Sequence, residues 1–96
     1  MPTWERTEEF NRQWRRLRPD QQRAFLAGVA EFVADLKRGG PPRPGLRIKR
    51  FCGIPGWWEM TWASDGRALF SYGLGVHPND PHVIWHRMGS HEIVEA

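Results

Sequence analysis

The sequence has very little cysteine, and this scarcity excludes two common ways of stabilising a small chain. Cys52 is the single cysteine among 96 residues, so neither an internal disulfide nor a cysteine-based zinc cage can form. One cysteine is typical of a reducing compartment, and we expect a cytoplasmic location. The chain also lacks a long apolar run, and its first residues include acids, so we expect neither a signal peptide nor a membrane-spanning segment.

Lysine is also scarce, and arginine supplies nearly all of the positive charge. Twelve of the fourteen cationic residues are arginine, whose planar guanidinium suits phosphate and carboxylate groups. Residues 1–36 are neutral overall, residues 37–50 carry six cations and no acid, and residues 51–96 have a net charge of −3. This basic block (residues 37–50) favours a polyanion or an acidic partner, although a solvated basic loop would have the same composition.

Aromatic residues, by contrast, are plentiful. The sequence contains six Trp and five Phe, and each ring buries a large area. A chain of this length buries only about 60 to 65 % of its unfolded surface, so the aromatic residues help it to form one core. We therefore expect residues 1–96 to form a single two-layer domain without cross-links.

The first half of the chain has helical periodicity. Thr7 can cap a helix over residues 8–17, with acids in its first turn and arginines in its last. A second helix is predicted over residues 21–37, with Asp20 as its N-cap and the Gly/Pro run at residues 39–42 as its stop signal. The short connection predicts that the two helices form an antiparallel α-hairpin.

From residue 46 onwards the apolar residues alternate with polar ones, which indicates β-strands. Strands are predicted over residues 46–52, 57–63, 67–72 and 82–87, with an Asp-Gly hairpin at residues 64–66 and a loop over residues 73–81. Residues 2–6 could add a short edge strand. The predicted fold class is therefore α+β: an N-terminal α-hairpin packed on one face of a three- to four-stranded antiparallel β-sheet.

The C-terminal segment is rich in histidine, and two kinds of site can be considered there. His82 and His86 lie about 13 Å apart on a strand at ~3.3 Å per residue, too far to bind one metal ion. Ser90, His91 and Glu92 offer the residue types of a hydrolase triad, but no nucleophile elbow accompanies them. We therefore expect neither a metal site nor a cofactor.

A third kind of site would be assembled across the strands. Six residues could reach one open face of the sheet: Arg47, Lys49, Glu59, Arg67, Arg87 and His91. Such a face offers cations for phosphate groups and side chains that move protons, which is what cutting RNA through its 2′-hydroxyl requires. The alternative is that a sheet face without helices is charged simply because it faces water.

The order of the segments "LRIKRF", "GWWEMTW", "DGRALFSY" and "HVIWHRMGSH" after two helices resembles the RelE/ParE superfamily of toxins from bacterial type II toxin–antitoxin systems. The resemblance spans nearly the whole chain. It implies a RelE-like fold and a metal-independent endoribonuclease that cleaves messenger RNA, in many cases on the ribosome. It also leaves open a non-catalytic ParE-like inhibitor of DNA gyrase, or another binding protein on the same fold.

The resemblance further implies roles for individual residues. Arg47 and Lys49, with Arg50 beside them, would bind RNA phosphates. Arg67 would stabilise the scissile phosphate, and His91 would act as a general acid or base. The remaining members of the catalytic set are Glu59, which matches the acid of a related strand motif, and Arg87, which matches a cation of the C-terminal strand. Many of these toxins carry an aromatic residue after the histidine, where this chain has Glu92 and Ile93.

The resemblance also implies a partner protein. Toxins of this kind are neutralised by a small cognate antitoxin that wraps around them. We expect an acidic or amphipathic segment of the antitoxin to meet the basic block, because complementary charges speed association. The expected partners are thus an antitoxin and messenger RNA, with no membrane involved.

Overall fold

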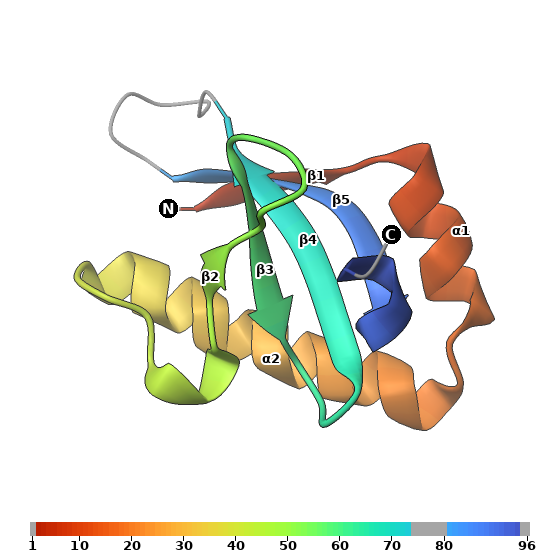
Figure 1. Cartoon of the computed structure of the whole chain (residues 1–96). Coiled ribbons are helices and arrows are strands. Elements are labelled where there is room, and N and C mark those ends of the chain that lie inside the picture. The colour runs from red at the N-terminus through yellow and green to blue at the C-terminus, as the bar shows by residue number, and fades with distance from the viewer. Residues whose placement is uncertain (1, 74–80, 95–96) are drawn as a thin grey trace.

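The computed structural model describes residues 2–73 and 81–94. The elements follow in the order β1 (Thr3–Arg6), α1 (Glu8–Arg16), α2 (Pro19–Arg38), η1 (Pro44–Leu46), β2 (Lys49–Arg50), β3 (Trp57–Thr61), β4 (Gly66–Tyr72), β5 (His82–Ser90) and η2 (His91–Val94). Figure 1 shows the helices packed beside the sheet, so the α+β class is confirmed. Most of the loop predicted at residues 73–81 lies outside the described residues, as does Glu95.

The sheet has five strands in the order β1-β5-β4-β3-β2. Strands β2 to β5 are antiparallel as predicted, but β1 pairs in parallel with β5, with Thr3 opposite His82 and Arg6 opposite Trp85. The prediction of three to four antiparallel strands is thus one strand short, and the sheet is mixed. Alternation along a strand does not specify the direction of its neighbour, and a parallel pair needs a long connection, which the helices and the other strands supply here.

The strand predicted over residues 46–52 is reduced to the two residues of β2. Pro44–Leu46 forms a 3-10 turn, and Arg47 then takes φ = 48°, a left-handed conformation that interrupts extended backbone. Leu46 is nevertheless buried. Cys52 is exposed. Arg47 therefore belongs to the turn that leads into the strand and not to the strand itself.

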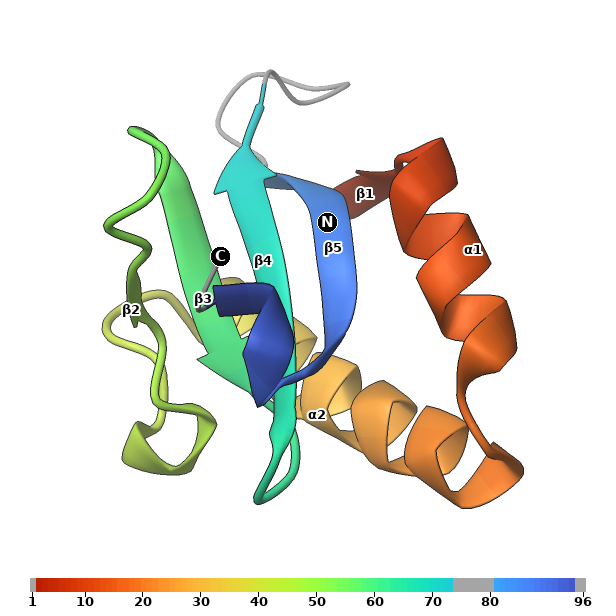
Figure 2. The same ribbon diagram turned by 45° about the vertical axis from the view of Figure 1, so that its right-hand side comes forward.

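The helix ends follow from local hydrogen bonds. Thr7 caps α1 as predicted, since its Oγ1 accepts from the backbone N–H of Phe10 at 3.1 Å. The N-cap of α2 is Arg18, not Asp20: the Arg18 backbone N–H donates to Gln21 Oε1 at 2.9 Å, and Pro19 starts the first turn. Figures 1 and 2 show α1 lying steeply across the direction of α2, so the two helices do not run antiparallel and alongside each other.

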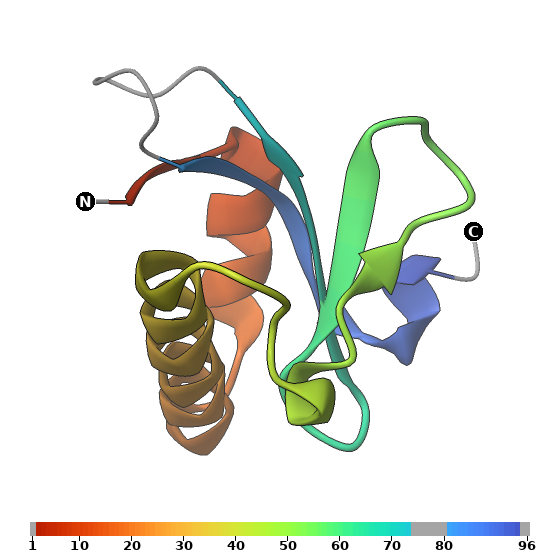
Figure 3. The ribbon, with the colours of Figure 1, turned by 90° about the vertical axis from the view of Figure 1, so that its left-hand side faces the viewer.

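Figure 3 shows the two helices on one side of the sheet, and the buried core side chains come from these helices and from the strands that they cover. Phe32 of α2 packs on Phe70 of β4 with ring centroids 5.0 Å apart, and Phe25 meets Trp85 of β5 at 5.5 Å. Among the described residues the opposite face carries no α-helix, only the short turn η2. This second face, called the open face below, is therefore available for a site.

No helix in the described part of the chain is long and apolar enough to span a membrane.

Asp35 ties the segment after α2 to the helix. The residue is 2 % exposed, and its carboxylate accepts from the Arg43 backbone N–H at 2.9 Å, from Arg43 Nη2 at 2.9 Å and from Arg38 Nη1 at 3.0 Å. Hydrogen bonds from the Arg43 side chain, then from its backbone, hold the pKa of Asp35 well below its usual range. Two cations of the basic block thus have an internal structural role.

Replacing Asp35 by asparagine is expected to lower stability at neutral pH, because Arg38 and Arg43 lose their anion. An Asp whose pKa is lower in the folded than in the unfolded state stabilises the fold at pH values above its ordinary pKa of about 3.9. This contribution is lost as the pH falls below that value. The gap in urea midpoint between wild type and Asp35→Asn should therefore narrow as pH is lowered from 7 to about 3. Asp20→Asn, which removes an exposed ion pair with Arg18, is the control and should change little. A gap that does not vary with pH would contradict this role.

Candidate functional site

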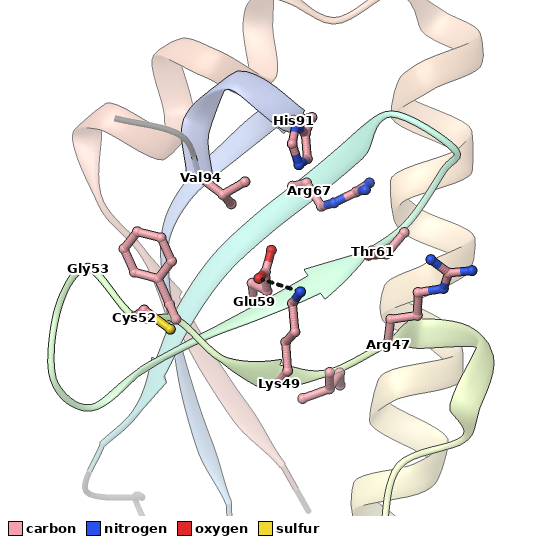
Figure 4. A pocket seen from close by; sticks show the side chains of 11 residues that line it. Arg47, Lys49, Cys52, Gly53, Glu59, Thr61, Arg67, His91 and Val94 are labelled. Carbon is pink, nitrogen blue, oxygen red and sulfur yellow. Dashed lines mark ion pairs between the residues drawn. The ribbon is translucent and has the colours of Figure 1, made fainter.

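The open face contains a hollow of about 610 Å³. Its walls come from the turn before β2, from β2 and the residues after it, from β3 and β4, and from η2, as Figure 4 shows. The lining side chains that matter below are Arg47, Lys49, Phe51, Glu59, Arg67 and His91. Segments up to 44 positions apart in the sequence thus share one surface, which we call the basic hollow.

The strand register explains why these residues meet. Lys49 lies opposite Glu59, and Thr61 lies opposite Arg67. Directly opposite residues point to the same face, and so do residues two apart on one strand. On its other side Arg67 lies opposite Gly89 of β5. Shortly after Gly89 the chain turns into η2, which brings His91 over the sheet. The antiparallel pairing therefore assembles the basic hollow from three strands and the C-terminal turn.

Glu59 is a nearly buried carboxylate on this face. Its residue is 7 % exposed, and its Oε1 lies 3.4 Å from Lys49 Nζ. A charged carboxylate has acceptor capacity for several hydrogen bonds, so an ion pair with one lysine leaves room for a substrate proton. Glu59 is thus placed to act as a base with restricted access to water.

Arg67 is held by the β3–β4 hairpin. Its Nη1 donates to the carbonyl oxygens of Gly66 at 3.0 Å and Ala63 at 3.3 Å. A guanidinium has five N–H donors in a fixed plane, so the donors on Nε and Nη2 are not used by these carbonyls. The hairpin therefore fixes the orientation of a group that can bind an anion in two places at once.

His91 lies at the rim of the basic hollow, next to Arg67 (Figure 4). Its backbone N–H donates to Asp65 Oδ1 at 3.3 Å, which links η2 to the same hairpin that holds Arg67. The residue is exposed. An imidazole in this position can exchange protons with solvent between reaction cycles.

Two residues of the predicted set do not line the basic hollow. Arg87 is on the open face but at its border, where Nε lies 2.8 Å from Glu9 Oε1 of α1. Arg50 lies opposite Trp58, with its guanidinium 5.3 Å from the centre of that ring, because alternation along β2 turns it to the face away from Lys49. The catalytic role predicted for Arg87 and the phosphate-binding role predicted for Arg50 gain no support from these positions.

The basic hollow is also lined by uncharged residues that were not among the predicted site residues, and Phe51 and Thr61 are two of them. Both were available from the alternating pattern: Phe51 is two positions after Lys49, and Thr61 is two positions after Glu59. Within residues 2–73 and 81–94, no group of three His, Cys, Asp or Glu side chains is placed to hold a metal ion.

These elements define a RelE-like fold: a mixed five-stranded sheet with two helices on one face and a cationic hollow on the other. The chain is similar to one in the E. coli DinJ-YafQ toxin–antitoxin complex, with a TM-score of 0.65 and 11 % identity, covering 99 % of this chain and 98 % of that chain. The YoeB/ParE toxin from Agrobacterium tumefaciens gives a TM-score of 0.65 at 11 % identity, covering 93 % and 98 %. The RelBE2 toxin–antitoxin complex from Mycobacterium tuberculosis gives 0.53 at 22 % identity, covering 92 % and 95 %.

The sequence itself matches no family model and no curated protein. At such low identities the structural likeness establishes the fold alone. The expectation of a RelE-like fold is confirmed, and what the protein does must be argued from the residues of the basic hollow.

Proposed function

We propose that this protein is the toxin of a type II toxin–antitoxin system and that it cleaves messenger RNA, including ribosome-bound messenger RNA, in the cytoplasm. The observation that carries the proposal is the gathering of Arg47, Lys49, Glu59, Arg67 and His91 in one hollow on the open face. The names of the structurally similar proteins support the toxin–antitoxin assignment. The alternative is a surface that is charged only because it faces water. Such a surface would not explain why Glu59 is nearly buried, since burying a carboxylate is costly.

In the proposed reaction the RNA supplies its own nucleophile. Glu59 takes the proton of a 2′-hydroxyl, whose oxygen forms a bond to the adjacent phosphorus while the bond from phosphorus to the 5′-oxygen breaks. His91 gives a proton to the departing 5′-oxygen. The products are a 2′,3′-cyclic phosphate and a 5′-hydroxyl, and the proton removed by Glu59 balances the proton given by His91.

The cations of the basic hollow have two tasks in this scheme. Arg67 binds the non-bridging oxygens of the scissile phosphate, where negative charge grows in the transition state. Arg47 and Lys49 bind phosphates along the strand and hold the RNA in place. Because the nucleophile is the 2′-hydroxyl and guanidinium groups offset the charge, the scheme needs no metal, and we expect cleavage to persist in a chelator.

Primer extension on translating ribosomes tests the proposal. On translating ribosomes, wild-type protein should produce new 5′ ends in a reporter messenger RNA within minutes. In a separate reaction that contains only purified RNA and the protein, cleavage should occur both with and without EDTA. A supercoiling assay with DNA gyrase should be unaffected. Gyrase inhibition without RNA cuts would instead favour the ParE-like alternative and reject the nuclease.

Association with the antitoxin is expected to depend on salt. An acidic antitoxin segment that covers the basic hollow would neutralise Arg47 and Lys49 and block the RNA at the same time. Raising the salt from about 0.05 M to 0.5 M should slow association about tenfold or more, since it shortens the screening length. The double variant Arg47→Ala/Lys49→Ala should lose most of this dependence, whereas Arg12→Ala on α1 should keep it. Equal association rates at both salt concentrations would contradict the electrostatic contribution.

A further inference from the structure

Three ring side chains lie on the open face next to the basic hollow. The rings of Trp57 and His86 are stacked, with centroids 4.0 Å apart and planes 10° from parallel. The ring of Phe51 lies 6.4 Å from that of Trp57. All three residues are partly exposed, and none belongs to the hydrophobic core that the described residues form. Their aromatic surface is therefore not needed to fill the interior.

A β-bulge in β5 brings this group together. Leu69 pairs with Arg87 while Phe70 pairs with Trp85, so His86 is an extra residue in β5. A bulge interrupts the strict alternation of side chains and re-aims them. As a result His86 stacks on Trp57, and the guanidinium of Arg87 also lies 5.4 Å from the centre of the Trp57 ring. Consecutive residues of β5 thus contact the same tryptophan.

The group is fixed by polar contacts at its edge. Ser71 Oγ lies 2.8 Å from His86 Nε2, and Glu9 Oε1 lies 2.8 Å from Arg87 Nε. Burial, and after it the charge of Arg87, lowers the pKa of His86, which favours the neutral imidazole, while Glu5 and Glu9 act in the opposite direction. The rings therefore form a preorganised stack beside a cation, and little ordering is left to be done when a flat ligand binds.

The position of the stack relative to the basic hollow suggests its ligand. Phe51 lines the basic hollow and also a small groove of about 150 Å³ that Trp57 lines too. Trp57 is two residues from Glu59 on the same face of β3, about 7 Å along the strand. An RNA strand with its scissile phosphate bound between Glu59 and Arg67 would carry the nucleotide on the Glu59 side towards these rings. Proteins bind unpaired bases by stacking them on aromatic side chains next to a cationic track for the backbone.

We propose that Phe51, Trp57 and His86 form a nucleobase-binding subsite that takes the unpaired base of a nucleotide next to the scissile phosphate. This inference rests on the proposed function of the basic hollow and adds a determinant of where the RNA is cut. Because every base has a flat face, the subsite recognises the presence of a base and tolerates different bases.

A thermodynamic cycle between Trp57 and the base tests the subsite. A set of short synthetic messenger RNAs is made in which one nucleotide is abasic, at a different position of the cut codon in each RNA. Each RNA is tested on programmed ribosomes and, in parallel, as free RNA. For wild type, an abasic nucleotide at one position next to the cut should lower the cleavage rate about tenfold. For Trp57→Ala, the intact RNA should already be cut about tenfold more slowly, and the same abasic nucleotide should have no further effect.

Trp4→Ala is the matched control. Trp4 is an exposed tryptophan that, like Trp57, has an arginine over its ring, here at 5.2 Å, but it lies opposite Val83 of the core and so points away from the open face. This variant should respond to the abasic nucleotide as wild type does. Trp57→Phe keeps a ring and should retain part of the effect, which separates loss of stacking from loss of folding.

The outcomes distinguish the subsite from the nuclease. If the Trp57→Ala and abasic effects multiply, or if no abasic position slows the wild type, the subsite is wrong while the nuclease stands. If wild-type protein cuts none of the RNAs, the proposed function fails and the subsite fails with it.

Discussion

Replacing Arg67 by alanine is expected to lower the rate of messenger RNA cleavage by about a hundredfold or more, the usual effect of removing one fixed donor to a developing charge. The guanidinium is held by the carbonyls of Gly66 and Ala63 and lines the basic hollow with His91. Lysine cannot bind an anion through two parallel N–H groups, so Arg67→Lys should recover only a small part of the rate. The measurement is the rate of formation of cut ends at saturating RNA.

The control for Arg67 is Arg23→Ala, which removes an exposed arginine from α2. Its cleavage rate should equal that of wild type. Because Arg67 also holds the hairpin, the melting temperature of Arg67→Ala must be measured alongside. A variant that is folded and cuts at the wild-type rate would remove Arg67 from the mechanism.

Replacing Glu59 by glutamine is expected to slow cleavage by about two orders of magnitude or more, as is typical when a general base is removed. Glutamine has nearly the same shape but cannot accept the 2′-hydroxyl proton. Glu59→Asp retains a carboxylate and should recover part of the rate. Glu8→Gln, which changes an exposed acid in the first turn of α1, is the matched control and should have no effect.

The pH profile separates a base from a residue that only pairs with Lys49. A base must have lost its proton before it can act, so the wild-type rate should rise with pH on the acidic side of the profile, and an acid at His91 should make it fall on the alkaline side. Glu59→Gln should abolish the acidic limb, and His91→Ala should abolish the alkaline limb. If Glu59→Gln were slow but kept both limbs, Glu59 would have a positioning role only.

Local signals in the sequence predicted much of the fold. Thr7 and Gly39 mark helix ends through contacts within one turn, and both behave as expected, with the Gly39 N–H bonded to Asp35 O at 3.2 Å. The direction of β1 was not predictable, because strand periodicity contains no information about the neighbouring strand. The shortening of β2 depends on the left-handed backbone of Arg47, which alternation of residue types does not reveal.

The basic hollow was only partly predictable for related reasons. Arg47, Lys49, Glu59, Arg67 and His91 converge because antiparallel pairing follows from the hairpins, which the turn residues indicate. Arg87 and Arg50 do not join them, since a charge on a strand does not show which acid or ring it will meet in the folded chain. The bulge at His86 is a property of the pairing of two strands, and single-strand patterns cannot show it.

In the proposed mechanism the basic hollow cuts RNA through the RNA's own 2′-hydroxyl. One substitution in the substrate tests this directly: a single 2′-deoxynucleotide placed 5′ to the cut in an otherwise unchanged synthetic messenger RNA. We predict that this RNA is bound but not cut, while the all-ribose RNA yields a 2′,3′-cyclic phosphate and a 5′-hydroxyl. Cleavage of the deoxy-substituted RNA at the same bond and at a similar rate would contradict the mechanism.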